Sequence, residues 1–140
     1  MTDRDHAKQI ATQYFQAFID GDIAWWRQNV SPDFIRHDPG LPYEVVGPAG
    51  LKHHHDVLLK GVPNLNLPIH DVMEDEGKVL VRLRFRGTHG GELFGRAATG
   101  NAIDVEVFDL FRVVNGKLVE HWAMVDTLGL MKQLGVTSSI

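Results

Sequence analysis

Apolar residues in the first half of the chain recur with the spacing of an α-helix. From about Asp3 to Asp20 they fall at positions i, i+4, i+5, i+8 and i+9, which lie on one side of a helix. Asp22 can cap a second, short helix, and Gly47-Pro48 can open a third that runs to Gly61, because proline fits the first turn. Between the second and third helices, the run from Phe34 to His37 is expected to be extended. The first half is therefore predicted to form three helices.

The second half changes to a period of two, which is typical of strands with one buried face. Its expected strands cover Leu65 to Asp75, Lys78 to Arg86, Ile103 to Val114 and Lys117 to Asp126. Pro68 would place the first of these at a sheet edge, and Asn115-Gly116 is a type I′ hairpin signal. A short helix from Leu128 to Leu134 would follow. This order indicates an α+β fold, with three helices packed on one face of a curved, mostly antiparallel sheet around a small-molecule pocket.

The composition narrows the class of protein. At 140 residues the chain has the length of one domain, so we expect a single domain over residues 1–140. It contains no cysteine, which excludes disulfides, thiolate metal sites and a cysteine nucleophile. Its net charge is −4, its lysines and arginines are scattered, and no apolar run approaches the roughly 20 residues of a membrane span. We therefore expect a cytoplasmic protein whose partners include neither nucleic acid nor membrane.

The predicted hairpin places an unusual mixture of residues on one face of the sheet. If Asn115-Gly116 is a two-residue loop, Asp109 lies opposite Trp122. The residues that then share this face are Val105, Val107, Asp109, Phe111, Glu120, Trp122, Met124 and Asp126. Large apolar groups beside carboxylates suit a ligand cavity, because apolar walls raise a carboxyl pKa and fit it for acid/base work. Asp126 has an equally simple alternative role as the N-cap of the final helix.

Two blocks of the sequence resemble the SnoaL-like polyketide cyclases. One lies within residues 87–100 and contains Gly-Thr-His, Gly-Glu-Leu-Phe-Gly and Thr-Gly, and the other is Gly-Lys-Leu-Val-Glu-His-Trp at 116–122, followed by Asp126. Arg36-His37-Asp38-Pro39 and Gln133-Leu134-Gly135 also fit, so the similarity covers nearly the whole chain. The resemblance implies the NTF2-like cone, which is a curved sheet and helices around one deep pocket, and oligomers that pair sheet to sheet.

The resemblance also implies roles for individual residues. In the cyclases an aspartate at the position of Asp126 is the general acid/base of an intramolecular aldol closure, and a histidine at the position of His37 assists. We expect His37 and His89 to bind substrate oxygens, and Asp109 to tune Asp126 by like-charge repulsion. The expected apolar wall consists of Phe111, Trp122 and Met124, with Tyr14 and Phe18 from the first helix. His37 could instead pair with Asp38 at the surface, and His89 could bind loop backbone.

The leading hypothesis is a cofactor-independent enzyme that cyclises or isomerises a small hydrophobic carbonyl compound. Water addition or removal, as in epoxide hydrolases and dehydratases of the same fold, is one alternative, and a non-catalytic binding protein is another. No metal is expected, because consecutive helical residues such as His53, His54 and His55 point about 100° apart and cannot converge on one ion.

A homodimer is expected through the outer face of the sheet. Its predicted apolar residues are Phe108, Leu110, Val119, Ala123 and Val125. A monomer would leave this patch exposed, which soluble proteins usually avoid.

Overall fold

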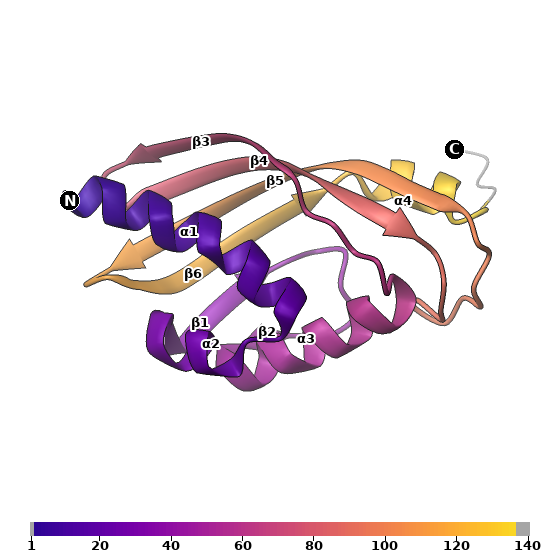
Figure 1. Cartoon of the computed structure of the whole chain (residues 1–140), viewed down its shortest axis with the longest axis horizontal. Coiled ribbons are helices and arrows are strands. Elements are labelled where there is room, and N and C mark those ends of the chain that lie inside the picture. The colour runs from indigo at the N-terminus through magenta and orange to yellow at the C-terminus, as the bar shows by residue number, and fades with distance from the viewer. Residues whose placement is uncertain (1, 137–140) are drawn as a thin grey trace.

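The computed structural model describes residues 2–136 and has four helices and six strands (Figure 1). The helices are α1 (Asp3–Asp20), α2 (Ile23–Asn29), α3 (Gly47–Gly61) and α4 (Thr127–Gln133). The strands are β1 (Val30–His37), β2 (Val45–Val46), β3 (Ile69–Asp75), β4 (Lys78–Thr88), β5 (Ala102–Val114) and β6 (Lys117–Val125). The predicted elements are all present, and the two-residue β2 is the one addition.

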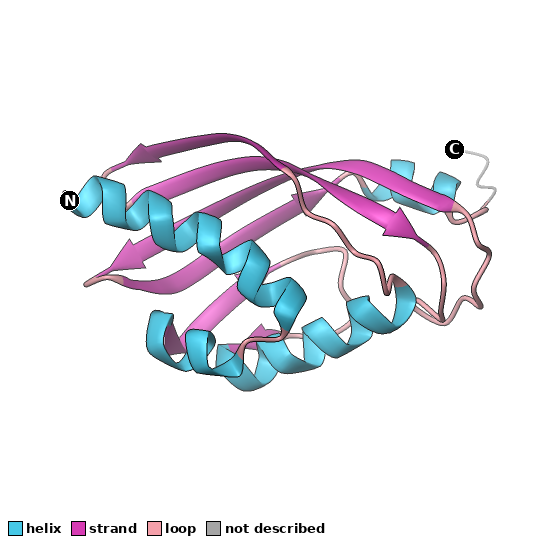
Figure 2. Cartoon of the chain, in the orientation of Figure 1, coloured by secondary structure: helices cyan, strands magenta, loops and turns pink. Residues whose placement is uncertain are grey.

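The strands form one open, curved sheet in the order β2-β1-β6-β5-β4-β3. All neighbouring pairs are antiparallel except β1 and β6, which are parallel. Figure 2 shows α1 running across the strands, with α2 and α3 covering the β1–β2 end on the same side. The α+β class and the packing of three helices on one face are therefore confirmed.

Helix α1 packs against the inner face of the sheet. Thr2 caps it by accepting a hydrogen bond from the Asp5 amide at 3.1 Å, and Gly21 ends it with a left-handed φ of 62°. The predicted apolar stripe is buried: Ile10, Tyr14 and Phe18 are 1–3% exposed. This stripe packs toward β3, β4 and β6, so α1 holds its aromatic residues over the inner face of the sheet.

The β5–β6 hairpin contains a bulge that alternation alone did not predict. Asn115-Gly116 forms the expected two-residue turn, and Val114 pairs with Lys117. The register then shifts, because Val113 pairs with Leu118 whereas Arg112 pairs with Glu120, which leaves Val119 as the extra residue.

The bulge reverses every later side chain of β6. Asp109 lies opposite Ala123 rather than Trp122, so the predicted face of β6 was wrong while that of β5 was right. His121 and Ala123 are fully buried on the inner face, whereas Met124 is 61% exposed on the outer one. Ala123 and Val125, predicted on the outer face, therefore turn inward, and Trp122 and Met124 replace them outside.

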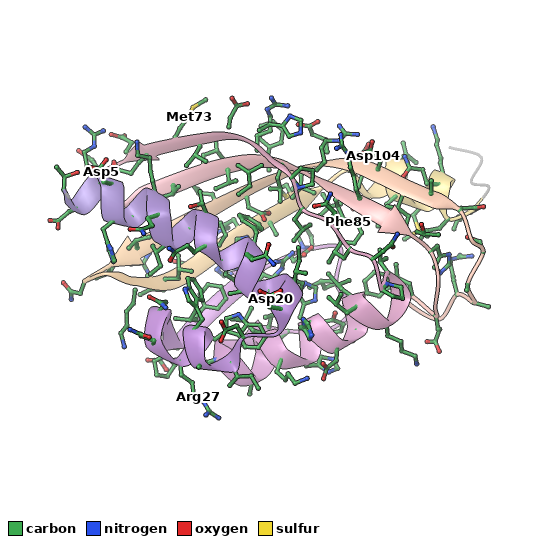
Figure 3. The ribbon with its side chains drawn as sticks, viewed as in Figure 1. Asp5, Asp20, Arg27, Met73, Phe85 and Asp104 are labelled. Atoms are coloured by element: carbon green, nitrogen blue, oxygen red, sulfur yellow. The ribbon has the colours of Figure 1, made fainter. Side chains whose placement is uncertain are left out.

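The two faces of the sheet differ clearly in their surroundings. Figure 3 shows Met73 projecting away from the helices, while Phe85 lies on the inner side and contributes to a pocket there.

In the part of the chain that the structure describes, no helix is both long enough and apolar enough to cross a bilayer.

Candidate functional site

A pocket lies between α1 and the sheet, as the sequence predicted. Its wall is largely leucine, valine and phenylalanine from α1, α3, α4, β4, β5 and β6 and from the segments after β1, before β3 and after β4. Its polar lining residues are Tyr14, Arg36, Asp38, His54, Thr127 and Asp109. Apolar walls with a few convergent polar groups are typical of a small-molecule site.

Asp109 and His121 form a buried pair on the sheet side of this pocket. Asp109 Oδ2 lies 3.3 Å from His121 Nε2, and the two side chains are 3% and 0% exposed. The imidazole is sandwiched by aromatic groups: it stacks on Phe111 at 4.1 Å and meets the edge of Tyr14 at 5.4 Å. Burial lowers the pKa of His121 although Asp109 opposes the shift, so the ring is neutral near pH 7.

Arg36 brings a second charged group into the pocket from β1. Its Nε and Nη2 both donate to Asp38 Oδ2, at 3.2 and 2.9 Å, while the Gly40 amide donates to Asp38 Oδ1 at 3.1 Å. Burial alone would lower the pKa of Arg36, but Tyr14, Asp109 and Asp38 together raise it, so the guanidinium stays charged. A buried cation therefore lines the pocket together with two carboxylates: Asp38, whose two oxygens accept hydrogen bonds, and Asp109, whose Oδ1 has no partner among the described residues.

Tyr14 supplies a hydroxyl to the same place. The residue is 1% exposed, and its hydroxyl has no hydrogen-bond partner among the described residues. Burial chiefly, with a contribution from the Asp109 charge, raises the pKa of Tyr14 to about 12, against the opposing influence of Arg36. Tyr14 is therefore a phenol with a proton to donate at neutral pH.

Unpaired buried polar atoms gather around this pocket. Over residues 2–136 seven buried side-chain nitrogen or oxygen atoms have no hydrogen-bond partner, and five of them belong to Tyr14, His54, Asp109 and His121. Both ring nitrogens of His121 are among them, because its 3.3 Å contact with Asp109 is close but does not have the geometry of a hydrogen bond. An unpaired buried polar atom costs about 1–3 kcal/mol, so folding alone does not favour such a concentration. A bound molecule with oxygen atoms would gain most from this part of the protein.

The predicted site residues separate into two groups. Asp109, Tyr14 and Phe18 line the pocket as expected, and Phe111 lies fully buried under His121. Trp122 and Met124 are not among the residues that line it, because the bulge turns them outward.

Three predicted catalytic residues also lie away from the pocket. Asp126 caps α4, its Oδ1 accepting from the Gly129 amide at 2.9 Å, which is the alternative that its spacing left open. His37 binds Glu120 Oε2 at 2.6 Å and stacks on Trp122 on the outer face. His89 is buried in the segment after β4, with Nδ1 2.9 Å from the Thr99 hydroxyl.

Four residues of the site were not predicted: Arg36, Asp38, His54 and His121. His121 was placed outside by the same error in register that placed Trp122 inside. His54 did carry a signal, because it lies three residues after Leu51 and four before Leu58 on the buried side of α3.

The three consecutive histidines of α3 point in different directions, as helical spacing predicts. His53 is exposed and packs against Tyr43, His54 lines the pocket, and His55 Nδ1 lies 2.6 Å from the Phe18 carbonyl oxygen. Within residues 2–136 no three histidine or carboxylate side chains are grouped as metal ligands.

Residues 8–134 match the family model described as SnoaL-like polyketide cyclase. The chain therefore belongs to the SnoaL-like polyketide cyclase family, and its fold is NTF2-like.

Two curated relatives from Streptomyces are similar over part of the chain. They are the aklanonic acid methyl ester cyclases DnrD of Streptomyces peucetius and DauD of Streptomyces sp. (strain C5). Each is 40% identical over 57 residues, or 41% of this chain, and the match spans 39% and 35% of their own lengths.

Solved structures match the whole fold. A SnoaL-like protein from Jannaschia sp. CCS1 superposes with a TM-score of 0.87 at 22% identity, covering 99% of this chain and 98% of its own. TsrD from Streptomyces laurentii gives a TM-score of 0.83 at 26% identity, with 98% and 100% covered. A Bacillus cereus ATCC 10987 structure described as a polyketide cyclase gives 0.78 at 30% identity, with 95% and 83% covered.

Proposed function

We propose that the protein catalyses a cofactor-independent, intramolecular aldol-type cyclisation of a small hydrophobic carbonyl compound, with Asp109 as the proton shuttle. The observation that carries this proposal is the buried, unpaired Oδ1 of Asp109 in an apolar pocket beside a guanidinium and a phenol. Membership of the family and the activity named for DnrD and DauD support the same reaction class.

The proposed reaction begins with proton removal. Asp109 takes a proton from a carbon next to a substrate carbonyl, and the electron pair of the broken C–H bond forms an enolate. The enolate oxygen would receive hydrogen bonds from the Tyr14 hydroxyl and from the Arg36 guanidinium, which both line the pocket. Preorganised donors aimed at developing negative charge are the usual source of rate enhancement in such sites.

The proton then returns to the substrate. The enolate carbon attacks a second carbonyl of the same molecule, a carbon–carbon bond forms, and the alkoxide takes the proton from Asp109. The product is an isomer of the substrate, so no oxidant, reductant or leaving group is needed. His121 acts here as a positioning residue, because its neutral ring lies 3.3 Å from Asp109 Oδ2 and is fixed by the Phe111 stack.

Asp109→Asn tests the shuttle, with Asp126→Asn as the matched control. Aklanonic acid methyl ester, the compound in the names of two relatives, is the first substrate to try, with turnover followed as conversion to an isomer of equal mass. We expect Asp109→Asn to lower turnover at least about 100-fold and Asp126→Asn to leave it within about twofold. Loss of turnover in Asp126→Asn alone would return the catalytic role to the residue that the family resemblance selected.

Epoxide hydration or alcohol dehydration is the second candidate. Two buried carboxylates, Asp38 and Asp109, line the pocket with Arg36, which is an arrangement that can hold a water and protonate an oxygen. Asp38 is the weaker of the two for such work because both of its oxygens already accept hydrogen bonds. Incorporation of ¹⁸O from labelled water into a styrene oxide probe would favour this reaction over cyclisation.

We also propose that the protein is a homodimer through the outer face of the sheet. Phe108 is 44% and Met124 61% exposed there and they pair across β5 and β6, and Leu110 and Trp122 form the next pair along the same face. Sedimentation should give a species of twice 15.7 kDa, and Phe108→Glu should convert it to the monomer. A wild-type protein that sediments only as a monomer at micromolar concentration would refute the dimer.

A further inference from the structure

His54 is a buried titratable group of the pocket to which the proposed reaction gives no role. It comes from α3, opposite the sheet, and only 1% of it is exposed. Its Nδ1 lies 2.8 Å from the Tyr43 hydroxyl, whereas its Nε2 is buried without a hydrogen-bond partner among the described residues. A buried imidazole with one free nitrogen in a ligand pocket is costly to folding, which points to a contact with a ligand.

The ring has a defined chemical state. Burial, reinforced by the positive charge of Arg36, keeps the pKa of His54 well below its ordinary value, so the ring is neutral. Burial also raises the pKa of Tyr43 to about 12, so its hydroxyl keeps its proton. A Tyr43 hydroxyl that donates to Nδ1 leaves the ring proton of His54 on Nε2, and this is the tautomer on which the inference depends.

The position of His54 relative to the Asp109 centre follows from α1. Tyr14 and Phe18 are one turn apart, with ring centres separated by 6.3 Å. His121 packs against Tyr14 at 5.4 Å, and His54 packs against Phe18 at 5.2 Å. The Asp109–His121 pair and His54 are therefore next to aromatic residues on successive turns of α1, Tyr14 and Phe18.

We infer that His54 is a specificity-determining residue whose Nε2–H binds a second carbonyl oxygen of the substrate, while the first carbonyl enolises at Asp109. This inference rests on the proposed function and adds the group that binds the second oxygen. Enolisation of the terminal carbon of a 1,5-dicarbonyl closes a six-membered ring, so such a compound is a suitable probe with one oxygen for each polar centre. The substrate class is a hydrophobic dicarbonyl compound rather than a monoketone.

The first test needs no ligand. A long-range ¹H–¹⁵N spectrum of ¹⁵N-histidine-labelled protein, assigned with His54→Phe, reports which nitrogen carries the proton. We expect the neutral Nε2–H form at pH 7, and we expect Tyr43→Phe to shift the Nδ1 resonance. A proton on Nδ1, or a charged ring at pH 7, would overturn the inference.

The second test compares two probes with the same skeleton, 1-phenylhexane-1,5-dione and 6-phenylhexan-2-one, which keeps the ketone that enolises and lacks the oxygen that His54 would bind. We expect His54→Phe to weaken calorimetric binding of the dione about tenfold and that of the monoketone less than about twofold, the loss of one buried hydrogen bond. His53→Phe, the same change at the neighbouring exposed position, should alter neither affinity.

The outcomes separate the two proposals. If both probes bind the wild type and His54→Phe weakens both equally or neither, His54 is only part of the wall and the inference is wrong while the proposed function stands. If neither probe binds the wild type, the carbonyl pocket itself is wrong, and both proposals fail.

Discussion

The sheet formed by β4 and β5 carries charged residues on both of its faces. Those on the outer face are paired with one another, whereas the one on the inner face keeps an unpaired oxygen atom. On the outer face, Arg82 and Arg84 both bind Glu106, and Arg84 also binds Asp104. These groups are solvent-exposed, and each has a partner in this ladder. On the inner face, Asp109 is buried beside His121 and keeps an unpaired oxygen. Paired surface charges need no function to explain them, whereas an unpaired buried carboxylate does.

The largest effect on stability should come from breaking the ion pair between Arg36 and Asp38 beside the pocket. Arg36→Met removes the cation and leaves Asp38 buried without it, which costs about 3–5 kcal/mol of unfolding free energy. Denaturation in urea at pH 7 would measure it. A smaller loss than that of an ordinary surface substitution would contradict the description of this pair as buried and interdependent.

The pH dependence of stability should also come from the inner face. Since the pKa values of His54 and His121 are lowered by folding, the unfolded chain binds more protons as the pH falls. Their contribution to stability is complete above about 6.5 and is lost below it, by at most about 1.4 kcal/mol per pH unit for each histidine. Urea denaturation between pH 7.5 and 5 should show this slope, and His54→Phe should reduce it. An unchanged slope in that variant would exclude His54 as a source.

Tyr14→Phe should separate stability from activity. Among residues 2–136 the Tyr14 hydroxyl has no hydrogen-bond partner, so its removal should leave stability unchanged or raise it by about 1 kcal/mol. Turnover should nevertheless fall at least about tenfold, because the enolate oxygen loses a donor. Thermal denaturation and kinetics on the same preparation would measure the stability and the turnover of the variant. A variant with lowered stability and normal turnover would show that the Tyr14 hydroxyl serves the fold and not the reaction.

The smallest effect should come from the outer ladder. Arg84→Met removes two exposed ion pairs, and we expect the melting temperature to stay within about 2 °C of wild type. Turnover should not change. A loss of stability as large as that of Arg36→Met would mean that the ion pairs of the outer face matter to the fold as much as the buried Arg36–Asp38 pair.

The fold was predictable because its signals are periodic. The apolar stripe of α1, the Asn115-Gly116 turn and the alternation along β5 each agree with the structure. Asp109 was therefore placed correctly on the inner face. The family was also recognisable, because the residues of each of its motifs are adjacent in the sequence.

The site was harder to predict because it depends on one extra residue. Val119 is an ordinary strand residue and gives no sign that it is bulged, yet it exchanges His121 for Trp122 at the inner face. Arg36 was missed for a different reason. A charged residue in a short extended run is typical of an exposed position, and only the tertiary structure supplies the Asp38, Tyr14 and Asp109 groups that keep it charged while buried.

Proton exchange at carbon tests the central claim most directly, because it needs no knowledge of the natural substrate. With 1-phenylhexane-1,5-dione in D₂O, ¹H NMR follows the loss of signal from hydrogens next to the carbonyls, with buffer alone as the background. If Asp109 abstracts a carbon-bound proton, wild-type protein should exchange them at least about 100-fold faster than Asp109→Asn, and Asp126→Asn should match wild type. Equal exchange by wild type and Asp109→Asn would contradict the assignment of Asp109 as the shuttle.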